Sequence, residues 1–228
     1  MKQIALDIGL PHEATLSGFL AGQNQAALQY LQAWSGGVTR SPVPVYLWGP
    51  SGVGKTHLLR AIRHELLAQG AAVGWLEPEG EPNAPFNEQW DVVLMDDVHL
   101  YGAEQQHTAF NWFVNAVSPA SGKPLGILAA GLLPPSDLPL REDLRTRLGW
   151  GHVFELHLLQ EQERRAVLRQ AADARGVFLS DDVMTFVLAR FSRDLGSLMQ
   201  LLDHLDRYAL QTKRAITIPL VKSMLEND

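Results

Sequence analysis

The segment from Gly49 to Thr56 has the spacing of a phosphate-binding loop, GxxxxGK[ST]. Such a loop must point backbone N–H groups at a polyphosphate, and glycines allow the backbone conformations that this requires. Lys55 can reach the β and γ phosphates, and the Thr56 hydroxyl can bind Mg²⁺. An amphipathic stretch follows, so a helix N-terminus faces the phosphates. We predict binding of ADP or ATP with Mg²⁺ by the residues Gly49, Pro50, Ser51, Gly52, Val53, Gly54, Lys55, Thr56 and His57. For His57, packing against the start of the helix is the alternative.

An acidic pair, Asp96 and Asp97, follows the apolar run 92–95. An acidic residue at the end of a buried strand beside a phosphate loop can hold Mg²⁺, and we assign this role to Asp96. We assign Asp97 to polarising the attacking water, although its carboxylate is one methylene shorter than that of a glutamate. The alternative for both residues is a solvated strand end.

Composition excludes several other classes of site. The chain has no cysteine, which rules out disulfides, thiolate zinc sites and cysteine nucleophiles. Its eight histidines include no HxH or HxxxH pair, so we predict no metal site beyond Mg²⁺. The net charge of −6 lies in the first 156 residues, and no Lys or Arg occurs between Arg63 and Lys123. This half therefore offers nucleic acid no broad basic face. Trp48 and Trp150 lie beside motifs and are expected to be buried.

Apolar runs alternate with helical patterns through the first two thirds of the 228 residues. The predicted strands are 43–48, 72–76, 92–95, 125–130 and 152–156. The predicted helices between them are 18–34, 55–69, 104–117 and 138–148. Strands that alternate with helices indicate a parallel sheet. After residue 157 only helices are predicted, at 161–175, 181–191, 194–211 and 218–226. We expect an α/β fold with a five-stranded parallel sheet, followed by a small all-α domain.

The N-terminus shows no targeting signal. The first ten residues lack the apolar core and cleavage site of a signal peptide. No run approaches the 18 uninterrupted apolar residues of a membrane-spanning helix. We therefore expect a cytoplasmic protein without a membrane partner.

Together, the phosphate loop, the acidic pair and the helical tail resemble AAA+ ATPases of the DnaA branch. The segments that indicate this branch are Thr15–Asn24, the pair Pro134-Pro135 and Arg147–Gly151. The stretch Ile216–Pro219 resembles the closing signature of the Hda proteins, which are DnaA-related regulators. The chain also stops at Asp228, before any basic helix-turn-helix domain, which favours Hda over DnaA. The resemblance implies an N-terminal arm at 1–15, a P-loop AAA+ core at 16–156 and a helical lid at 157–228.

Two further segments gain a role from this resemblance. Hda proteins carry an N-terminal peptide that binds the sliding clamp, the DNA polymerase III β subunit, and residues 3–8 are similar to it. In that peptide Gln3 makes polar contacts and apolar side chains enter a pocket. The matching residues are Gln3, Ile4, Leu6 and Ile8. A short edge strand or a disordered start is the alternative. Arg147 matches the family's arginine finger, which acts on ATP bound by DnaA. The alternative is an ordinary ion pair, since Arg141 and Arg145 lie nearby.

Two polar sensor positions of the family are occupied by other residue types. Leu132 and Gly196 stand where a polar residue and an arginine are usual, and Arg193, one turn before Gly196, is a weak substitute. We therefore expect nucleotide binding with little hydrolysis. The implied function is a regulatory adaptor that binds the DNA-loaded clamp and promotes hydrolysis of DnaA-bound ATP, which prevents re-initiation. An active AAA+ ATPase that loads a helicase or remodels proteins is the alternative. Sequence-specific DNA binding is not expected, and a homodimer stays open.

Overall fold

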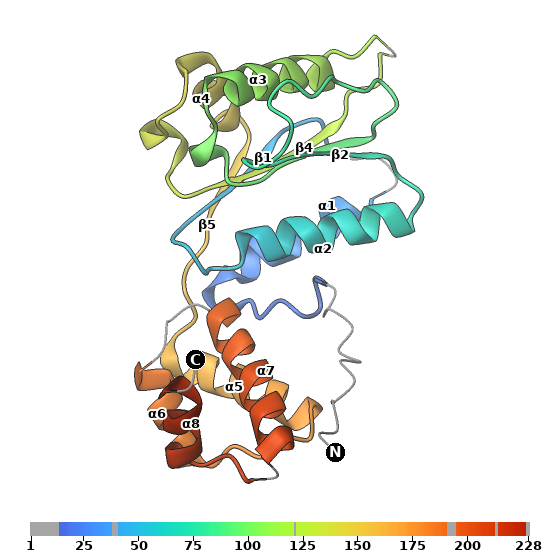
Figure 1. Cartoon of the computed structure of the whole chain (residues 1–228). Coiled ribbons are helices and arrows are strands. Elements are labelled where there is room, and N and C mark those ends of the chain that lie inside the picture. Colours follow the sequence, from blue (N-terminus) through green and yellow to red (C-terminus); the bar gives the residue numbers. More distant parts are fainter. Residues whose placement is uncertain (1–13, 38–40, 121, 191–194, 213, 227–228) are drawn as a thin grey trace. The chain divides into compact units, whose positions relative to one another are not determined.

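The computed structural model describes residues 14–37, 41–120, 122–190, 195–212 and 214–226. The chain divides into two units, of which the first ends at His157 and the second begins at Leu158. The first unit is an α/β structure and the second is helical (Figure 1).

The sheet of the first unit is parallel throughout and has the order β2-β3-β4-β1-β5. Its strands are β1 (Val45–Trp48), β2 (Val73–Leu76), β3 (Val92–Met95), β4 (Gly126–Gly131) and β5 (His152–Glu155). The five-stranded parallel sheet expected from the sequence is therefore confirmed. The chain leaves central strand β1, reaches the edge at β2 and returns through β3 to β4. The strand order thus reverses beside β1, and ligands of such sheets bind at the carboxyl ends of the strands next to that reversal.

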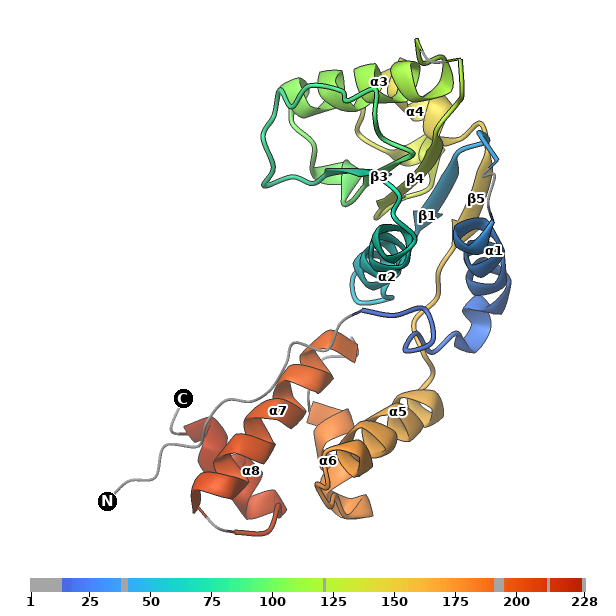
Figure 2. The same cartoon turned by 90° about the vertical axis from the view of Figure 1, so that its right-hand side faces the viewer.

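Helices cover both faces of this sheet (Figures 1 and 2). On one face lie α1 (Gln25–Gly36) and α2 (Lys55–Ala68), and on the other lie α3 (Ala103–Val117) and α4 (Glu142–Leu148). Alternate strand residues such as Tyr46, Val93 and Met95 pack against α3 and α4 in one apolar core. The intervening Leu47 and Leu94 are equally buried, as expected for a sheet covered on both sides.

The second unit contains α5 (Glu161–Ala174), α6 (Asp181–Arg190), α7 (Leu195–Thr212) and α8 (Ile218–Glu226). These helices share an apolar core of their own, which includes Leu168, Met184, Leu198, Leu202 and Val221. The expected all-helical region is therefore present. Among the described residues, no helix has the length and apolar character needed to cross a membrane.

The helix predicted over residues 18–34 is wrong in its first part. The α-helix begins at Gln25, and residues 22–24 form the 3₁₀ helix η1 (Gly22–Asn24). Before it, the backbone N–H of Gly18 donates to the Thr15 hydroxyl oxygen at 3.0 Å, which closes a turn. Gly22 then adopts a φ of 48°, a left-handed conformation that ends any regular helix running through it. Phe19 and Leu20 matched the helical spacing but lie in this turn segment.

Asn24 joins the two ends of the first unit. Its side-chain amide donates to the His157 carbonyl at 2.9 Å, and its carbonyl accepts from the His157 N–H at 2.7 Å. The Asn24 side chain is buried at 3% exposure, whereas His157 lies at the surface, so both hydrogen bonds are partly buried. This pair fixes the segment before α1 beside the chain that leaves β5.

We expect Asn24→Ala to reduce the free energy of unfolding by about 2–3 kcal/mol, because both hydrogen bonds between the buried Asn24 side chain and the His157 backbone are lost. In a chain of this size the melting temperature should fall by roughly 5–10 °C. Asn111→Ala, at an exposed position of α3, is the control and should change it little. Equal melting temperatures for the two variants would contradict a stabilising role of the Asn24–His157 hydrogen bonds.

Candidate functional site

The loop between β1 and α2 has the backbone that phosphate binding requires. Gly49, Gly52 and Gly54 adopt φ values of 149°, 81° and 94°, a region that only glycine enters easily. A Cβ on Gly49 would collide with the Leu156 carbonyl oxygen, and one on Gly54 would lie 2.7 Å from the Phe19 ring. The glycines of the motif are therefore fixed by both conformation and space.

The start of α2 presents free backbone donors to this loop. Gly54 is the N-cap residue and has no side chain to satisfy the first N–H groups of the helix. Lys55 is buried at 6% exposure, and its Nζ donates to the carbonyls of Gly49 at 2.8 Å and Pro50 at 3.0 Å. Burial lowers the pKa of Lys55, and the charges of Asp97 and Asp96 oppose this. Free N–H groups beside a buried ammonium fit a polyphosphate.

The turn segment before α1 lies against the same helix start. The ring of Phe19 packs over Gly54, with its centroid 6.1 Å from that of His57. The Nε2 atom of His57 is 3.0 Å from the Thr15 carbonyl oxygen. His57 therefore contacts this segment. Phe19 was assigned no role in the sequence analysis, and its only signal was its place in the Thr15–Asn24 segment.

Asp96 lies at the end of β3, buried at 3% exposure. Burial raises the pKa of its carboxyl group. Hydrogen bonds from the Thr56 hydroxyl and the Asp97 backbone N–H, together with the charge of Arg60, oppose this rise, while the charge of Asp97 adds to it. The structure therefore brings the loop residue Thr56 and the acidic residue Asp96 into direct contact.

This pair of oxygen donors fits Mg²⁺ that arrives with a nucleotide. Within the described part of the chain, no three His, Asp or Glu side chains form a group that could hold a metal ion alone. Mg²⁺ in nucleotide sites usually takes one or two carboxylates and completes its shell with phosphates and water. Thr56 and Asp96 could supply the protein ligands, and the ion would neutralise phosphate charge.

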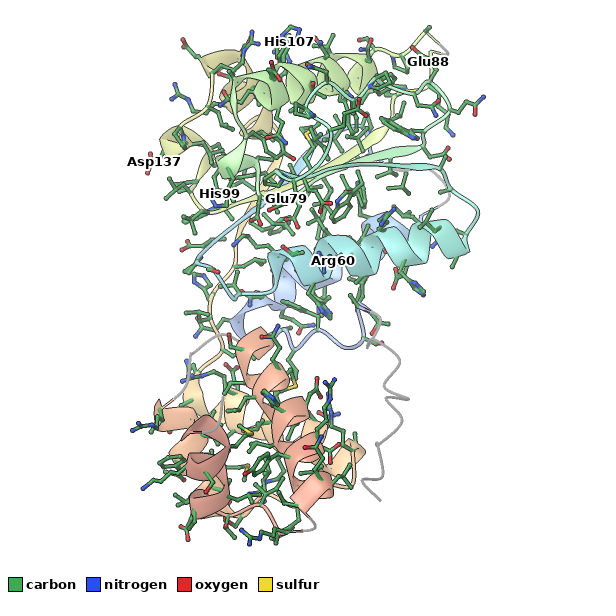
Figure 3. The ribbon with its side chains drawn as sticks, in the orientation of Figure 1. Arg60, Glu79, Glu88, His99, His107 and Asp137 are labelled. Atoms are coloured by element: carbon green, nitrogen blue, oxygen red, sulfur yellow. The ribbon has the colours of Figure 1, made fainter. Side chains whose placement is uncertain are left out.

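Asp97 occupies an unusual backbone conformation next to Asp96. Its φ of 45° is the only positive value of a non-glycine residue among those described. Such conformations cost energy and often mark functional positions. The Nδ1 atom of His99 lies 3.9 Å from an Asp97 carboxylate oxygen and forms no hydrogen bond with the described residues. Burial lowers the pKa of His99, against the charge of Asp97. His99, labelled in Figure 3, is a neighbour of Asp97 that the sequence analysis did not single out.

The two sensor positions hold no polar side chain. Leu132 directly follows β4, the strand between β1 and β3, and is 37% exposed. Leu132 therefore lies at the carboxyl ends of the strands, where the phosphate loop and the acidic pair also lie, and its side chain offers no hydrogen bond there. Gly196 lies in the first turn of α7, in the second unit. Arg193 falls outside the described residues, as do Gln3, Ile4, Leu6 and Ile8 of the N-terminal peptide.

Arg147 lies on α4 and not among the loop residues. Its guanidinium carbon is 4.7 Å from the ring centroid of Phe110 on α3. Among the described residues, its side chain has no carboxylate partner, unlike Arg141, which pairs with Asp143 at 2.7 Å. The ion-pair alternative therefore describes Arg141 and not Arg147.

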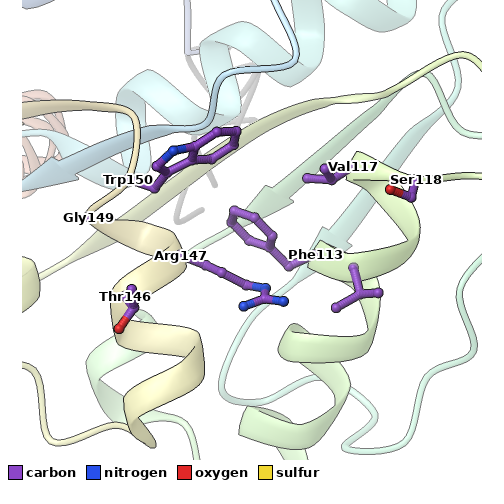
Figure 4. A pocket seen from close by; sticks show the side chains of 8 residues that line it. Phe113, Val117, Ser118, Thr146, Arg147, Gly149 and Trp150 are labelled. Atoms are coloured by element: carbon purple, nitrogen blue, oxygen red, sulfur yellow. The ribbon is translucent and has the colours of Figure 1, made fainter.

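A groove of about 550 Å³ opens beside Arg147 (Figure 4). Its lining includes Phe113 and Val117 of α3 and Trp150 just after α4. Trp150 is 64% exposed, so the expectation that it is buried is wrong. The preceding Gly149 packs on Pro135, and the following Gly151 has no room for a Cβ beside the Pro44 carbonyl, so the backbone turns tightly here. This course leaves the indole at the surface.

Comparisons with known proteins agree with this geometry. A family model described as "Hda, lid domain" matches residues 161–225, and one described as "Bacterial DnaA ATPase domain" matches residues 10–76. A protein of Haemophilus influenzae is 34% identical over 230 residues, which covers 98% of each chain. The chain belongs to the DnaA-related AAA+ family that includes Hda. The resemblance stated from the sequence is thereby confirmed.

Solved structures of this AAA+ family have the same fold. Domain III of the replication initiation protein DnaA from Thermotoga maritima matches with a TM-score of 0.75 and 22% identity, over 96% of this chain and 98% of that one. AMPPCP-bound DnaA from Aquifex aeolicus matches with a TM-score of 0.71 and 20% identity, over 87% of this chain and 66% of that one. At these identities the likeness is one of fold.

We expect Asp96→Asn to stabilise the nucleotide-free AAA+ protein and to weaken its Mg²⁺-dependent nucleotide binding. Burial raises the pKa of Asp96, so the fold disfavours the charged form. The contribution of the Asp96 carboxyl group to stability is therefore largest below its ordinary pKa of 3.8. This contribution falls as pH rises through the raised pKa and stays low at neutral pH. A gain of about 1 kcal/mol would raise the melting temperature by roughly 2–4 °C.

The measurement is a thermal melt with and without Mg²⁺ and ADP or ATP. Glu88→Gln, at an exposed loop position (Figure 3), removes the same charge without relieving burial and should leave both quantities unchanged. A destabilised Asp96→Asn variant that keeps full Mg²⁺-dependent binding would contradict both assigned effects.

Proposed function

We propose that this protein is a nucleotide-binding regulator of DnaA, which promotes hydrolysis of DnaA-bound ATP while held at the DNA-loaded sliding clamp. The observation on which this rests is that Arg147 forms no ion pair with any described residue, in a chain whose residues 161–225 match the Hda lid model. A regulator that acts on another subunit's nucleotide needs a cation that is not neutralised within its own fold.

Binding of ADP or ATP is supported by the loop itself. Its glycine conformations, the free N–H groups of α2 and the buried Lys55 together suit a polyphosphate. A DnaA of the same fold is described as AMPPCP-bound. The leucine at position 132 and the glycine at position 196 supply no polar group to a γ phosphate. We therefore infer that the bound nucleotide stabilises the protein and is hydrolysed slowly.

The arginine-finger role of Arg147 is supported by its place in the fold. The residue lies on α4, whereas the loop of its own chain follows β1. Within the part of the chain that the structure describes, its guanidinium pairs with no carboxylate that it would have to leave before it meets a phosphate. The exposed Trp150 and the adjoining groove give the surrounding surface apolar area that a partner could cover. An arginine that reaches a neighbour's nucleotide must lie on such a contact surface.

Arg147→Ala should reduce the hydrolysis of DnaA-bound ATP to the rate of DnaA alone, because arginine fingers contribute about 10³-fold or more. The assay measures ATP and ADP on DnaA with this protein, clamp and DNA present. Arg145→Ala removes the same charge two residues earlier on α4 and should keep the stimulation. If Arg147→Ala stimulates normally, the finger role is wrong. Brisk ATP turnover by the protein alone would favour the active-ATPase alternative.

Gln3→Ala should abolish binding to the clamp and raise the concentration needed for half-maximal stimulation by at least about tenfold, because the clamp concentrates the protein at DNA. Excess protein should restore the maximal rate, since Arg147 is intact. Asp7→Ala, at a motif position that accepts any residue, is the control. Clamp pull-down and titration of the stimulated reaction give the readout, and unchanged clamp binding of Gln3→Ala would exclude this motif.

A further inference from the structure

Phe110 of α3 contacts two arginines from the α4 region. The guanidinium carbon of Arg147 is 4.7 Å from the ring centroid, and that of Arg141, the residue before α4, is 5.0 Å away. Phe110 itself is only half-buried. The aromatic ring therefore lies at the surface, within reach of two cations, at the place where α3 and α4 pack together.

The two arginines are held in different ways. Arg141 donates to Asp143 at 2.7 Å, its backbone N–H donates to Gln106 Oε1 at 2.9 Å, and its guanidinium lies 3.4 Å from His107 Nδ1. Arg147 has none of these restraints: among the described residues its guanidinium forms no hydrogen bond or ion pair, and it lies against the Phe110 ring. Asp143 therefore forms its ion pair with Arg141, and the Arg147 guanidinium contacts the Phe110 ring instead.

The neighbouring carboxylate does not compete for this second cation. Desolvation acts to raise the pKa of Asp143, but the hydrogen bonds from Arg141 and the Leu144 N–H, with the charges of Arg141 and Arg147, lower it. Asp143 therefore stays ionised and stays hydrogen-bonded to Arg141. It balances one of the two positive charges near Phe110, which reduces the repulsion that the pair would otherwise feel.

An aromatic ring suits an arginine that must later bind a phosphate. A carboxylate would orient the guanidinium through its N–H groups and would have to be displaced first. An aromatic face attracts the cation through the plane of the guanidinium and leaves the N–H edge free for bidentate contacts. It also restricts a side chain that would otherwise lose rotamer entropy when it binds a phosphate.

We propose that Phe110 is a positioning residue that holds the Arg147 guanidinium in one place, with its N–H edge free for a phosphate on a partner subunit. The proposal rests on the proposed function, because it gives a reason for the contact only if Arg147 acts on another subunit's nucleotide. It goes beyond that function in assigning a role to an aromatic residue that touches neither nucleotide.

The first test examines the isolated protein by NMR. The ring current of Phe110 should shift the Nε–Hε signal of Arg147, which Arg147→Lys identifies by its loss. Phe110→Leu keeps an apolar side chain and should move this signal toward the position of a free arginine, whereas Phe110→Tyr should retain the shift. An Arg147 signal that is the same in wild type and Phe110→Leu overturns the proposal.

The second test uses the full reaction with DnaA, clamp and DNA. Phe110→Leu should lower the maximal stimulated rate about five- to tenfold and change the half-maximal concentration less than twofold. Phe110→Tyr should stay within twofold of wild type. A Phe110→Leu variant that loses only apparent affinity, or behaves as wild type, overturns the proposal while Arg147→Ala stays inactive. Normal stimulation by Arg147→Ala defeats the proposed finger role instead. Thermal melts verify that each variant is folded.

Discussion

The strand order of the parallel sheet is the constraint on which the nucleotide site depends. β1 lies between β4 and β5, and β4 joins it to β3, so the segments after β1, β3 and β4 meet at one edge. They deliver the phosphate loop, the acidic pair and Leu132 respectively. The two hydrogen bonds between Asn24 and His157 then fix the segment before α1. Phe19, five residues before Asn24, belongs to this segment and packs on the phosphate loop at Gly54. A local loop motif thus becomes a site through contacts between residues far apart in sequence.

Charge at this edge is held at a cost to stability. Burial disfavours the ammonium of Lys55, which the charges of Asp97 and Asp96 oppose, and the carboxylate of Asp96, which the charge of Arg60 opposes. Asp97 adds negative charge from a left-handed backbone conformation. A polyphosphate with Mg²⁺ would supply negative charge beside Lys55 and positive charge beside Asp96. Binding would therefore stabilise an arrangement that is poorly balanced by itself, as is usual for sites shaped by function.

Strand and helix positions followed from local pattern, and most of the site followed from motif spacing. The buried strands were visible as short apolar runs, and Gly49–Thr56 required its backbone by composition alone. The error over residues 18–24 arose because Phe19 and Leu20 fit a helical period, while the turn made by Thr15 and Gly18 prevailed. Trp150 was wrongly expected to be buried, because its exposure depends on the tight backbone turn at Gly149 and Gly151. The contact of Phe110 with Arg147 depends on packing between helices, which periodicity does not report.

The phosphate-loop edge of the sheet and the α3–α4 surface carry different kinds of side chain. At the loop edge, the position after β4 offers a leucine, which cannot orient a water or report a γ phosphate. On the α3–α4 surface, Arg147 lies against the Phe110 ring and forms no ion pair with the residues that the structure describes, while Arg141 pairs with Asp143. An enzyme that hydrolysed its own nucleotide would need a polar side chain that contacts the γ phosphate, and the position after β4 does not supply one. Under the proposed function, this asymmetry has one explanation: the loop edge stabilises the protein with a retained nucleotide, and the catalytic group is directed outward.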